Sequence, residues 1–257
     1  MIEKEVVRDN FSRAADSYDQ YAVVQRYMAK KLDNYLQDID EVDKVLEIGG
    51  GTGLFTELLI NRFLGSNYLI VDISPKMIAK CRDKFRDYQQ VKYLLADGER
   101  LKLEEKFDLI ISNATFQWFE NLKLALINLK EQLNEDGEIY FSIFGDKTFQ
   151  ELRSCFQEVK GEDSYSQKFF SKFELRRILA EEFRAVEIRE EEYIERFPNV
   201  RDFLRATKKI GANSAKKDKP PLTPGLLKKI ERKYMEKYRE DNQIIVTHHL
   251  LFVRLQK

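Results

Sequence analysis

The 257-residue sequence is poor in cysteine and has no net charge, and both properties narrow the protein class. Its only cysteines are Cys81 and Cys155, and no Cys-x-x-Cys pair or Cys/His cluster occurs. We therefore expect no disulfide framework, no structural zinc site and a reducing, cytoplasmic location. No apolar run approaches the ~18 residues of a membrane span, and the acidic start of the chain argues against a signal peptide. The 44 basic and 44 acidic residues cancel, which argues against a nucleic-acid-binding protein.

What the sequence does contain is short apolar runs that alternate with segments of helical periodicity. Strands are predicted at 44–48, 68–72, 91–97, 107–112, 137–143, 186–197 and 243–255. Helices are predicted at 3–15, 21–37, 54–63, 76–86, 122–133, 148–159, 172–183, 199–210 and 223–240. Strands alternating with helices at this spacing predict an α/β fold with a doubly wound, mostly parallel, seven-stranded sheet.

The length and the element pattern favour a single domain over residues 1–257. Residues 1–38 show no strand pattern and are predicted to form an N-terminal helical cap. Residues 40–145 carry the alternating core. Residues 198–242 are predicted to form an inserted helical lid between the last two strands, above one edge of the sheet.

A glycine-rich turn follows the first predicted strand. The segment 47–53 reads Glu-Ile-Gly-Gly-Gly-Thr-Gly, and its glycines fall as G-x-G-x-G. The dinucleotide form G-x-G-x-x-G would need glycine at position 54, which is Leu54, so a pyrophosphate cradle is disfavoured. Glycine lets the backbone turn tightly and approach a ligand closely. A plain strand-to-helix connection is the alternative.

Acidic residues end three successive strands near this turn. Glu47 ends the first strand and faces the turn, Asp72 ends the second, and Asp97 ends the third and precedes Gly98. Parallel sheets bind ligands at the carboxyl ends of their strands. A carboxylate at Asp72 can accept hydrogen bonds from both hydroxyls of a ribose, and Asp97 can reach an adenine amino group. A single solvated carboxylate would be ordinary. The glycine turn and the three acidic strand ends together, at successive strand ends, favour a nucleoside site.

At these residues the sequence resembles the class I S-adenosylmethionine-dependent methyltransferases. The matching pieces are LEIGGGTG at 46–53, VDIS at 71–74, LLADGERL at 94–101 and FDLIISN at 107–113. The resemblance implies a Rossmann-like methyltransferase fold, S-adenosylmethionine as cofactor with S-adenosylhomocysteine as product, and no metal. The cofactor-binding residues that it implies are Glu47, Gly49, Gly51, Thr52, Gly53, Asp72, Ile73, Met77, Asp97, Gly98, Glu99 and Asn113.

The flanking segments resemble one family in particular, the malonyl-carrier-protein O-methyltransferases of biotin synthesis. The pieces that carry this resemblance are residues 11–19 with Tyr21, the segment SNATFQW at 112–118, Gly-Ala-Asn at 211–213 and Thr-His-His at 247–249. It implies methyl transfer to the free carboxylate of a malonyl thioester, carried by acyl carrier protein or coenzyme A. The substrate-binding residues that it suggests are Tyr21, Asn113, Gln117, Trp118, Lys208, Lys209, Asn213 and His249.

Two residues are predicted to serve the reaction itself. Arg201 begins the inserted segment and is expected to hold the malonyl carboxylate, because a guanidinium binds a carboxylate through two parallel hydrogen bonds. Tyr18 is expected to close over the cofactor from the cap and to hydrogen-bond near the reacting group. A surface arginine and an ordinary packed tyrosine are the alternatives.

The neutral chain has a strongly basic segment. Residues 201–240 hold 13 basic and 5 acidic residues. Such a field can attract an acidic acyl carrier protein, with Arg205, Lys208, Lys209, Lys216 and Lys217 as the docking residues, or can simply be a solvated helix face. Another small-molecule carboxyl methyltransferase, a nucleic-acid binder and a non-catalytic cofactor sensor are the rival functions.

Overall fold

The computed structural model describes residues 2–161, 169–212 and 222–257. Its strands form one sheet in the order β3-β2-β1-β4-β5-β8-β6, with the short β7 paired to β8. The strands are β1 Lys44–Ile48, β2 Asn67–Asp72, β3 Val91–Leu95, β4 Phe107–Asn113, β5 Leu133–Phe144, β6 Ala185–Phe197, β7 Arg239–Glu240 and β8 Gln243–Gln256. The five strands β1–β5 are parallel, and β8 runs antiparallel to β5 and β6.

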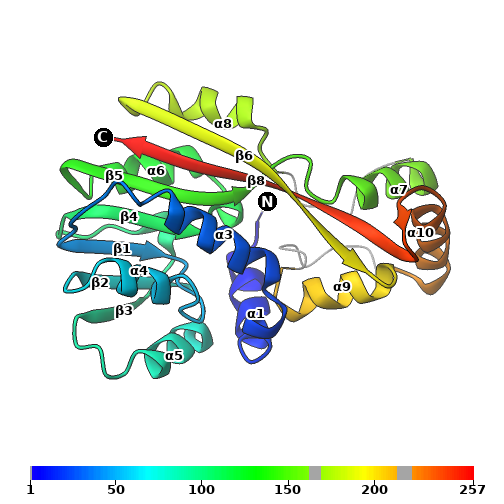
Figure 1. Ribbon diagram of the computed structural model, residues 1–257, viewed down its shortest axis with the longest axis horizontal. Coiled ribbons are helices and arrows are strands. Elements are labelled where there is room, and N and C mark those ends of the chain that lie inside the picture. The colour runs from blue at the N-terminus through cyan, green and yellow to red at the C-terminus, as the bar shows by residue number, and fades with distance from the viewer. Residues whose placement is uncertain (1, 162–168, 213–221) are drawn as a thin grey trace.

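Helices cover both faces of this sheet (Figure 1). One buried cluster joins the sheet to α3 Val23–Asn34, α4 Thr56–Arg62 and α5 Pro75–Lys84. The opposite cluster joins it to η2 Phe116–Trp118, α6 Leu122–Lys130 and α8 Lys172–Leu179. The remaining helical segments are α1 Lys4–Ala14, α2 Tyr18–Tyr21, η1 Gly98–Arg100, α7 Gln150–Lys160, α9 Val200–Lys209 and α10 Pro224–Lys237. The doubly wound α/β architecture predicted from the sequence is therefore confirmed.

The hairpin of β6 and β8 reaches beyond the rest of the sheet. Pairing of β5 with β8 ends at Phe144 and Leu250, whereas β6 stays paired with β8 as far as Phe197 and Ile244. This extension, together with α7, α9 and α10, encloses a third apolar core, which includes Phe203 and Tyr234. In Figure 1 these three helices lie beside the free end of the hairpin.

The structure differs from the predicted elements at several points. The expected helix at 21–37 is the shorter α3, and a separate segment, α2, precedes it; the two meet at Ala22, where ψ is 51° and not helical. Strand β5 begins at Leu133, because the predicted end of the preceding helix already pairs with β4 at Phe107. Helix α7, which precedes the predicted lid, packs against α10.

None of the described helices is long and apolar enough to span a membrane.

Candidate active site

The carboxyl ends of β1 and β2 build the centre of the site. The turn after β1 places Gly49 and Gly51 in the left-handed region, with φ of 75° and 57°, which glycine adopts without steric cost. A Cβ on Gly49 would lie 2.1 Å from Thr115 Oγ1, so only glycine fits there. The Asp72 carboxylate accepts hydrogen bonds from the backbone N–H of Gly51 at 2.9 Å and of Ser74 at 2.8 Å. The acidic strand end and the glycine turn therefore form one unit.

Two pockets adjoin this unit. The larger one encloses about 630 Å³ of empty space including its mouth, and Asp72, Ile73, Met77, Asp97 and Gly98 are among its lining residues. The smaller one, of about 290 Å³, is lined by Glu47, Gly50 and Thr52 among others. Four residues line both pockets and mark their junction: Tyr18, Gly49, Gly51 and Asn113.

Burial shifts the acid–base behaviour of the two strand-end carboxyls. Burial raises the pKa of Asp72 to about 6, against the opposing effect of the backbone N–H groups of Ser74 and Gly51. Burial also raises the pKa of Glu47 to about 7, although the Thr56 hydroxyl donates to it at 2.6 Å. Both carboxyls are desolvated, and no described Lys, Arg or His pairs with either of them. A ligand that brings hydrogen-bond donors would replace the hydrogen bonds to water that the two carboxyls lose on burial.

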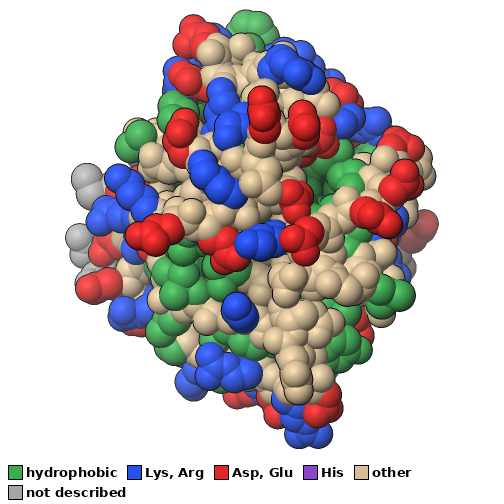
Figure 2. Space-filling model, turned by 90° about the vertical axis from the view of Figure 1, so that its left-hand side faces the viewer, with side chains coloured by type: hydrophobic (Ala, Val, Ile, Leu, Met, Phe, Trp, Pro, Cys, Tyr) green, Lys and Arg blue, Asp and Glu red, His purple; other side chains and the backbone are tan. Residues whose placement is uncertain are grey.

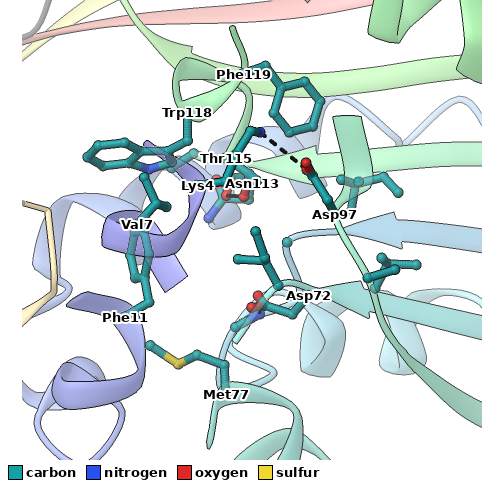
Figure 3. A pocket seen from close by; sticks show the side chains of 18 of the residues that line it. Lys4, Val7, Phe11, Asp72, Met77, Asp97, Asn113, Thr115, Trp118 and Phe119 are labelled. Atoms are coloured by element: carbon teal, nitrogen blue, oxygen red, sulfur yellow. Dashed lines mark hydrogen bonds and ion pairs between the residues drawn. The ribbon is translucent and has the colours of Figure 1, made fainter. Parts of the chain in front are cut away.

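A lysine from the first helix closes the far end of the larger pocket. Lys4 Nζ lies 3.2 Å from Asp97 Oδ1 and 2.5 Å from Glu99 Oε2, and 4.6 Å from the centre of the Phe119 ring. Figure 3 shows Lys4, Asp97 and Phe119 converging, with a dashed line between Lys4 and Asp97. The Glu99 carboxylate also accepts the backbone N–H of Asn121 at the start of α6. Glu99 thus anchors the pocket rim and does not line the pocket.

Aromatic side chains from the cap form the wall opposite Asp72. The ring of Phe11 on α1 meets that of Trp118 edge-on, with their centres 5.6 Å apart, and it lies 6.5 Å from the ring of Tyr18. All three residues line the larger pocket, and Figure 3 shows Phe11 and Trp118 side by side. Burial raises the pKa of Tyr18, and the charges of Asp72 and Asp19 add to this, so its phenol is neutral.

The segment after β4 supplies a fixed amide at the pocket junction. Asn113 donates through Nδ2 to the Gln25 carbonyl at 3.1 Å, and its Oδ1 accepts from Ser142 Oγ at 2.7 Å. Gln117, in the following segment η2, donates to the Ala114 carbonyl at 2.6 Å and is buried without lining either pocket. The Trp118 indole N–H is buried and has no hydrogen-bond partner among the described residues.

Several residues predicted for the site lie elsewhere. Arg201 is exposed, and its guanidinium forms two hydrogen bonds with Glu231 at 2.9 and 3.1 Å, so it would have to leave Glu231 to bind a carboxylate. Gly53 packs against Phe85 behind the turn. The residues Gly53, Tyr21, Arg201, Lys208, Lys209 and His249 do not line either pocket. Asn213, Lys216 and Lys217 fall outside the described residues.

His249 occupies a buried polar position in the sheet. It is 2% exposed, with Nδ1 3.2 Å from Asp146 and Nε2 3.3 Å from Glu190. The neighbouring His248 alternates to the other face of β8, where its ring lies among Phe144, Phe149 and Tyr193. His249 thus joins β8 to its neighbours in the structure and is not placed at either pocket.

Sequence reasoning named Tyr18 from the cap, which lines both pockets, but missed the part of the site that helix α1 supplies. Lys4, Val7 and Phe11 all line the larger pocket, yet a lysine and two apolar residues in a short helix are ordinary features. Phe11 belongs to a segment that carried the family resemblance, and this was the available signal. No group of three or more His, Cys, Asp and Glu side chains in the described part of the chain is arranged to hold a metal ion.

Comparison with known proteins places this site in a family. Residues 46–141 match the family model described as "Methyltransferase domain". A malonyl-acyl-carrier protein O-methyltransferase 2 of Ilyobacter polytropus is 39% identical over 257 residues, covering 100% of this chain and 99% of that protein. The malonyl-acyl-carrier protein O-methyltransferase of Bacillus anthracis is also 39% identical and covers 100% of this chain and 98% of its own. The chain belongs to the malonyl-acyl-carrier protein O-methyltransferase family. It is an S-adenosylmethionine-dependent methyltransferase.

Solved structures agree with the fold of this methyltransferase. The YcgJ protein of Bacillus subtilis gives a TM-score of 0.65 at 12% identity, covering 90% of this chain and 98% of its own. A phosphoethanolamine N-methyltransferase 2 of Haemonchus contortus was solved with phosphomonomethylethanolamine and S-adenosylhomocysteine. It gives a TM-score of 0.62 at 17% identity, and the match covers 98% of this chain and 60% of its own. At these identities the likeness concerns the fold alone.

The residues that line the two pockets fit S-adenosylmethionine. The desolvated Asp72 carboxylate suits two ribose hydroxyls, and the larger pocket is walled by apolar and aromatic side chains on the nucleoside side. The smaller pocket holds Glu47, whose buried carboxyl suits an ammonium group. The sulfonium would then fall at the junction, beside Tyr18 and Asn113.

Proposed function

We propose that this methyltransferase transfers the methyl group of S-adenosylmethionine to the free carboxylate of a malonyl thioester, with malonyl-acyl carrier protein as the natural acceptor. The observation that carries the proposal is the 39% identity to malonyl-acyl-carrier protein O-methyltransferases along the whole chain. The product would be a neutral methyl ester, which fatty-acid enzymes can extend toward the pimeloyl chain of biotin. The alternative is another small-molecule carboxylic acid as acceptor.

The chemistry places few demands on the protein. A carboxylic acid with a pKa of roughly 4 is already ionised at neutral pH, so no general base is needed. An acceptor oxygen forms a bond to the methyl carbon as the bond from carbon to sulfur breaks, and S-adenosylhomocysteine leaves. The protein must align the two reactants and exclude water. A junction between Tyr18 and Asn113, roofed by Phe11 and Trp118, supports both tasks.

Mass spectrometry tests this function directly. Malonyl-acyl carrier protein incubated with the methyltransferase and S-adenosylmethionine should gain the mass of one methylene group, since CH₃ replaces the acid proton. Acetyl-acyl carrier protein, which lacks the free carboxylate, is the matched control and should stay unchanged. No mass gain on the malonyl carrier, together with methylation of another carboxylic acid, would support the alternative acceptor.

We further propose that the carrier protein docks on α9, near the cap. Arg205, Lys208 and Lys209 are exposed on this helix, and Lys209 is next to the cap because its carbonyl accepts from Ser17 Oγ at 2.7 Å. By contrast, the face at the amino ends of the parallel strands carries interspersed positive and negative side chains (Figure 2). The basic α9 surface suits the acidic helix of a carrier protein, and charge pairing of this kind acts mainly on association.

Charge reversal on α9 should separate the two acceptor types. In K208E/K209E the KM for malonyl-acyl carrier protein should rise about tenfold, because attraction between exposed charges guides encounter. The KM for a small malonyl thioester whose thiol part carries no charge should stay within twofold of the wild-type value. The reversal K228E/K229E on the exposed face of α10 is the control. Raising the salt concentration should mimic K208E/K209E, since screening acts over ~8 Å. Equal effects on both acceptors would contradict docking at α9.

A further inference from the structure

Gly211 and Ala212 line neither pocket, yet the structure gives this segment a specific geometry. Helix α9 ends in two reverse hydrogen bonds, from Gly211 N–H to the Lys208 carbonyl at 3.1 Å and from Ala212 N–H to the Thr207 carbonyl at 3.2 Å. Gly211 has φ of 73°. This is a Schellman helix stop, in which the residue after the helix adopts the left-handed conformation that favours glycine. The helix stop explains the conformation of Gly211 but not its surroundings.

The surroundings of Gly211 are the backbone of another helix. Gly211 is buried, and a Cβ placed on it would lie 3.0 Å from the Asn10 carbonyl oxygen and 3.1 Å from Phe11 Cα. These are main-chain atoms of α1, which cannot rotate away as a side-chain tip can. The end of α9 therefore sits on α1 at a distance that a side chain of any size would increase.

A second contact fixes the same two segments. Ser17 Oγ, in the turn between α1 and α2, lies 2.7 Å from the Lys209 carbonyl, one of the last carbonyls of α9. Such carbonyls lack partners within their own helix, so this hydroxyl satisfies a group that would otherwise need water. Figure 1 shows α9 lying beside the blue cap helices. The α9 end is thus held by α1 through Gly211 and by the α1–α2 turn through Ser17.

The cap residues at this contact are also the wall of the cofactor pocket. Phe11, whose Cα faces Gly211, packs its ring on Trp118 and lines the larger pocket. Tyr18 follows Ser17 and lines both pockets. A displacement of α1 by a few tenths of an ångström at Gly211 would be passed to both side chains, because packed interiors transmit strain.

We propose that Gly211 is a positioning residue for methyl transfer: it seats the lid helix α9 directly on the α1 backbone, and this seat holds Phe11 and Tyr18 against the cofactor. The lid and the cofactor pocket are thereby coupled, so that a lid displaced from α1 weakens cofactor binding. The inference rests on the proposed function only in taking the two pockets as the S-adenosylmethionine site.

The substitution Gly211→Ala tests this, and Gly161→Ala is its matched control. Gly161 ends α7 with φ of 77°, and no described atom lies within 4 Å of its Cβ position. Both substitutions impose the same backbone strain, but only the one at 211 meets α1. In G211A the Kd for S-adenosylhomocysteine, measured by calorimetry, should rise about tenfold, and in G161A it should change less than twofold. The KM for S-adenosylmethionine should follow the Kd.

The fluorescence of Trp118 gives a readout that a general loss of stability would not move. Trp118 is the single tryptophan of the chain and touches Phe11, so its emission in the folded, ligand-free protein reports the position of α1. The emission should shift in G211A and stay unchanged in G161A. If G211A does not fold, Ser17→Ala decides, with an expected threefold rise in Kd and a smaller shift. Unchanged emission and Kd in G211A or, failing that, S17A would overturn the inference, whereas a wild type that binds no S-adenosylhomocysteine would overturn the proposed function instead.

Discussion

Replacing Asp72 by asparagine is expected to abolish useful cofactor affinity, raising the Kd for S-adenosylhomocysteine on the order of a hundredfold. We propose that this carboxylate, at the end of β2, accepts hydrogen bonds from the ribose hydroxyls, and it is itself oriented by Gly51 and Ser74. Hydrogen bonds to a charged acceptor contribute about 1.5–3 kcal/mol each, and a loss of about 3 kcal/mol is a factor of a hundred or more. Calorimetric titration of both proteins measures the loss, with circular dichroism as the control for folding.

The pH dependence of cofactor binding and of stability in the wild type is a second test of the Asp72 carboxyl. Binding needs the ionised form, so affinity should fall as the pH drops through about 6, the pKa to which burial raises Asp72. The effect on folding has the opposite sign. Because this pKa lies above the ordinary 3.8, the folded, ligand-free protein binds the proton more tightly than the unfolded chain. The stability of the wild type relative to D72N should therefore decrease as the pH rises from about 4 to 6. A flat difference would refute the assignment.

The substitution Gly49→Ala should have the largest effect on stability, about 2–5 kcal/mol. A non-glycine residue at φ of 75° costs about 1–2 kcal/mol, and the new methyl group would lie 2.1 Å from Thr115 Oγ1 and 2.7 Å from Thr115 Cβ. Forcing extra atoms into a packed position adds about 1–3 kcal/mol. Denaturant unfolding measures the loss.

Gly51→Ala separates the two causes of that loss. Gly51 has φ of 57°, and apart from its chain neighbours no described residue has an atom within 4 Å of its Cβ position. G51A should therefore lose only the backbone contribution, about 1–2 kcal/mol. The double variant G49A/T115G should recover the steric part, because the methyl group then has room. If G49A and G51A were equally stable, the contact between Gly49 and Thr115 would have no energetic weight.

The core of the fold and the half of the site at the strand ends could be predicted from the sequence, because the signals that specify them are local. The strand, the glycine turn and the acidic strand end at 44–53 and 67–72 obey short-range rules of periodicity and backbone conformation. Their partners in a parallel sheet follow from topology, which brings the carboxyl ends of β1, β2 and β3 together. Asp72, Asp97 and Gly49 thus appear in the larger pocket as expected.

The other half of the site depends on contacts between segments that are distant in sequence. Nothing in the order of residues indicates that Lys4 reaches Asp97, that Phe11 meets Trp118, or that Glu231 engages Arg201. The expectation that Arg201 faces the substrate treated its helix as isolated, whereas α10 brings an opposite charge within 2.9 Å.

Backbone conformation and alternation are properties of a few neighbouring residues, so the order of amino acids alone specified the α/β sheet, its glycine turn and the acidic strand ends. Which helices close over that sheet was decided by packing across the chain. The cap supplies the pocket wall, and α9 rests on it where Gly211 carries no side chain. Such contacts depend on the relative placement of whole elements, which a local pattern does not encode.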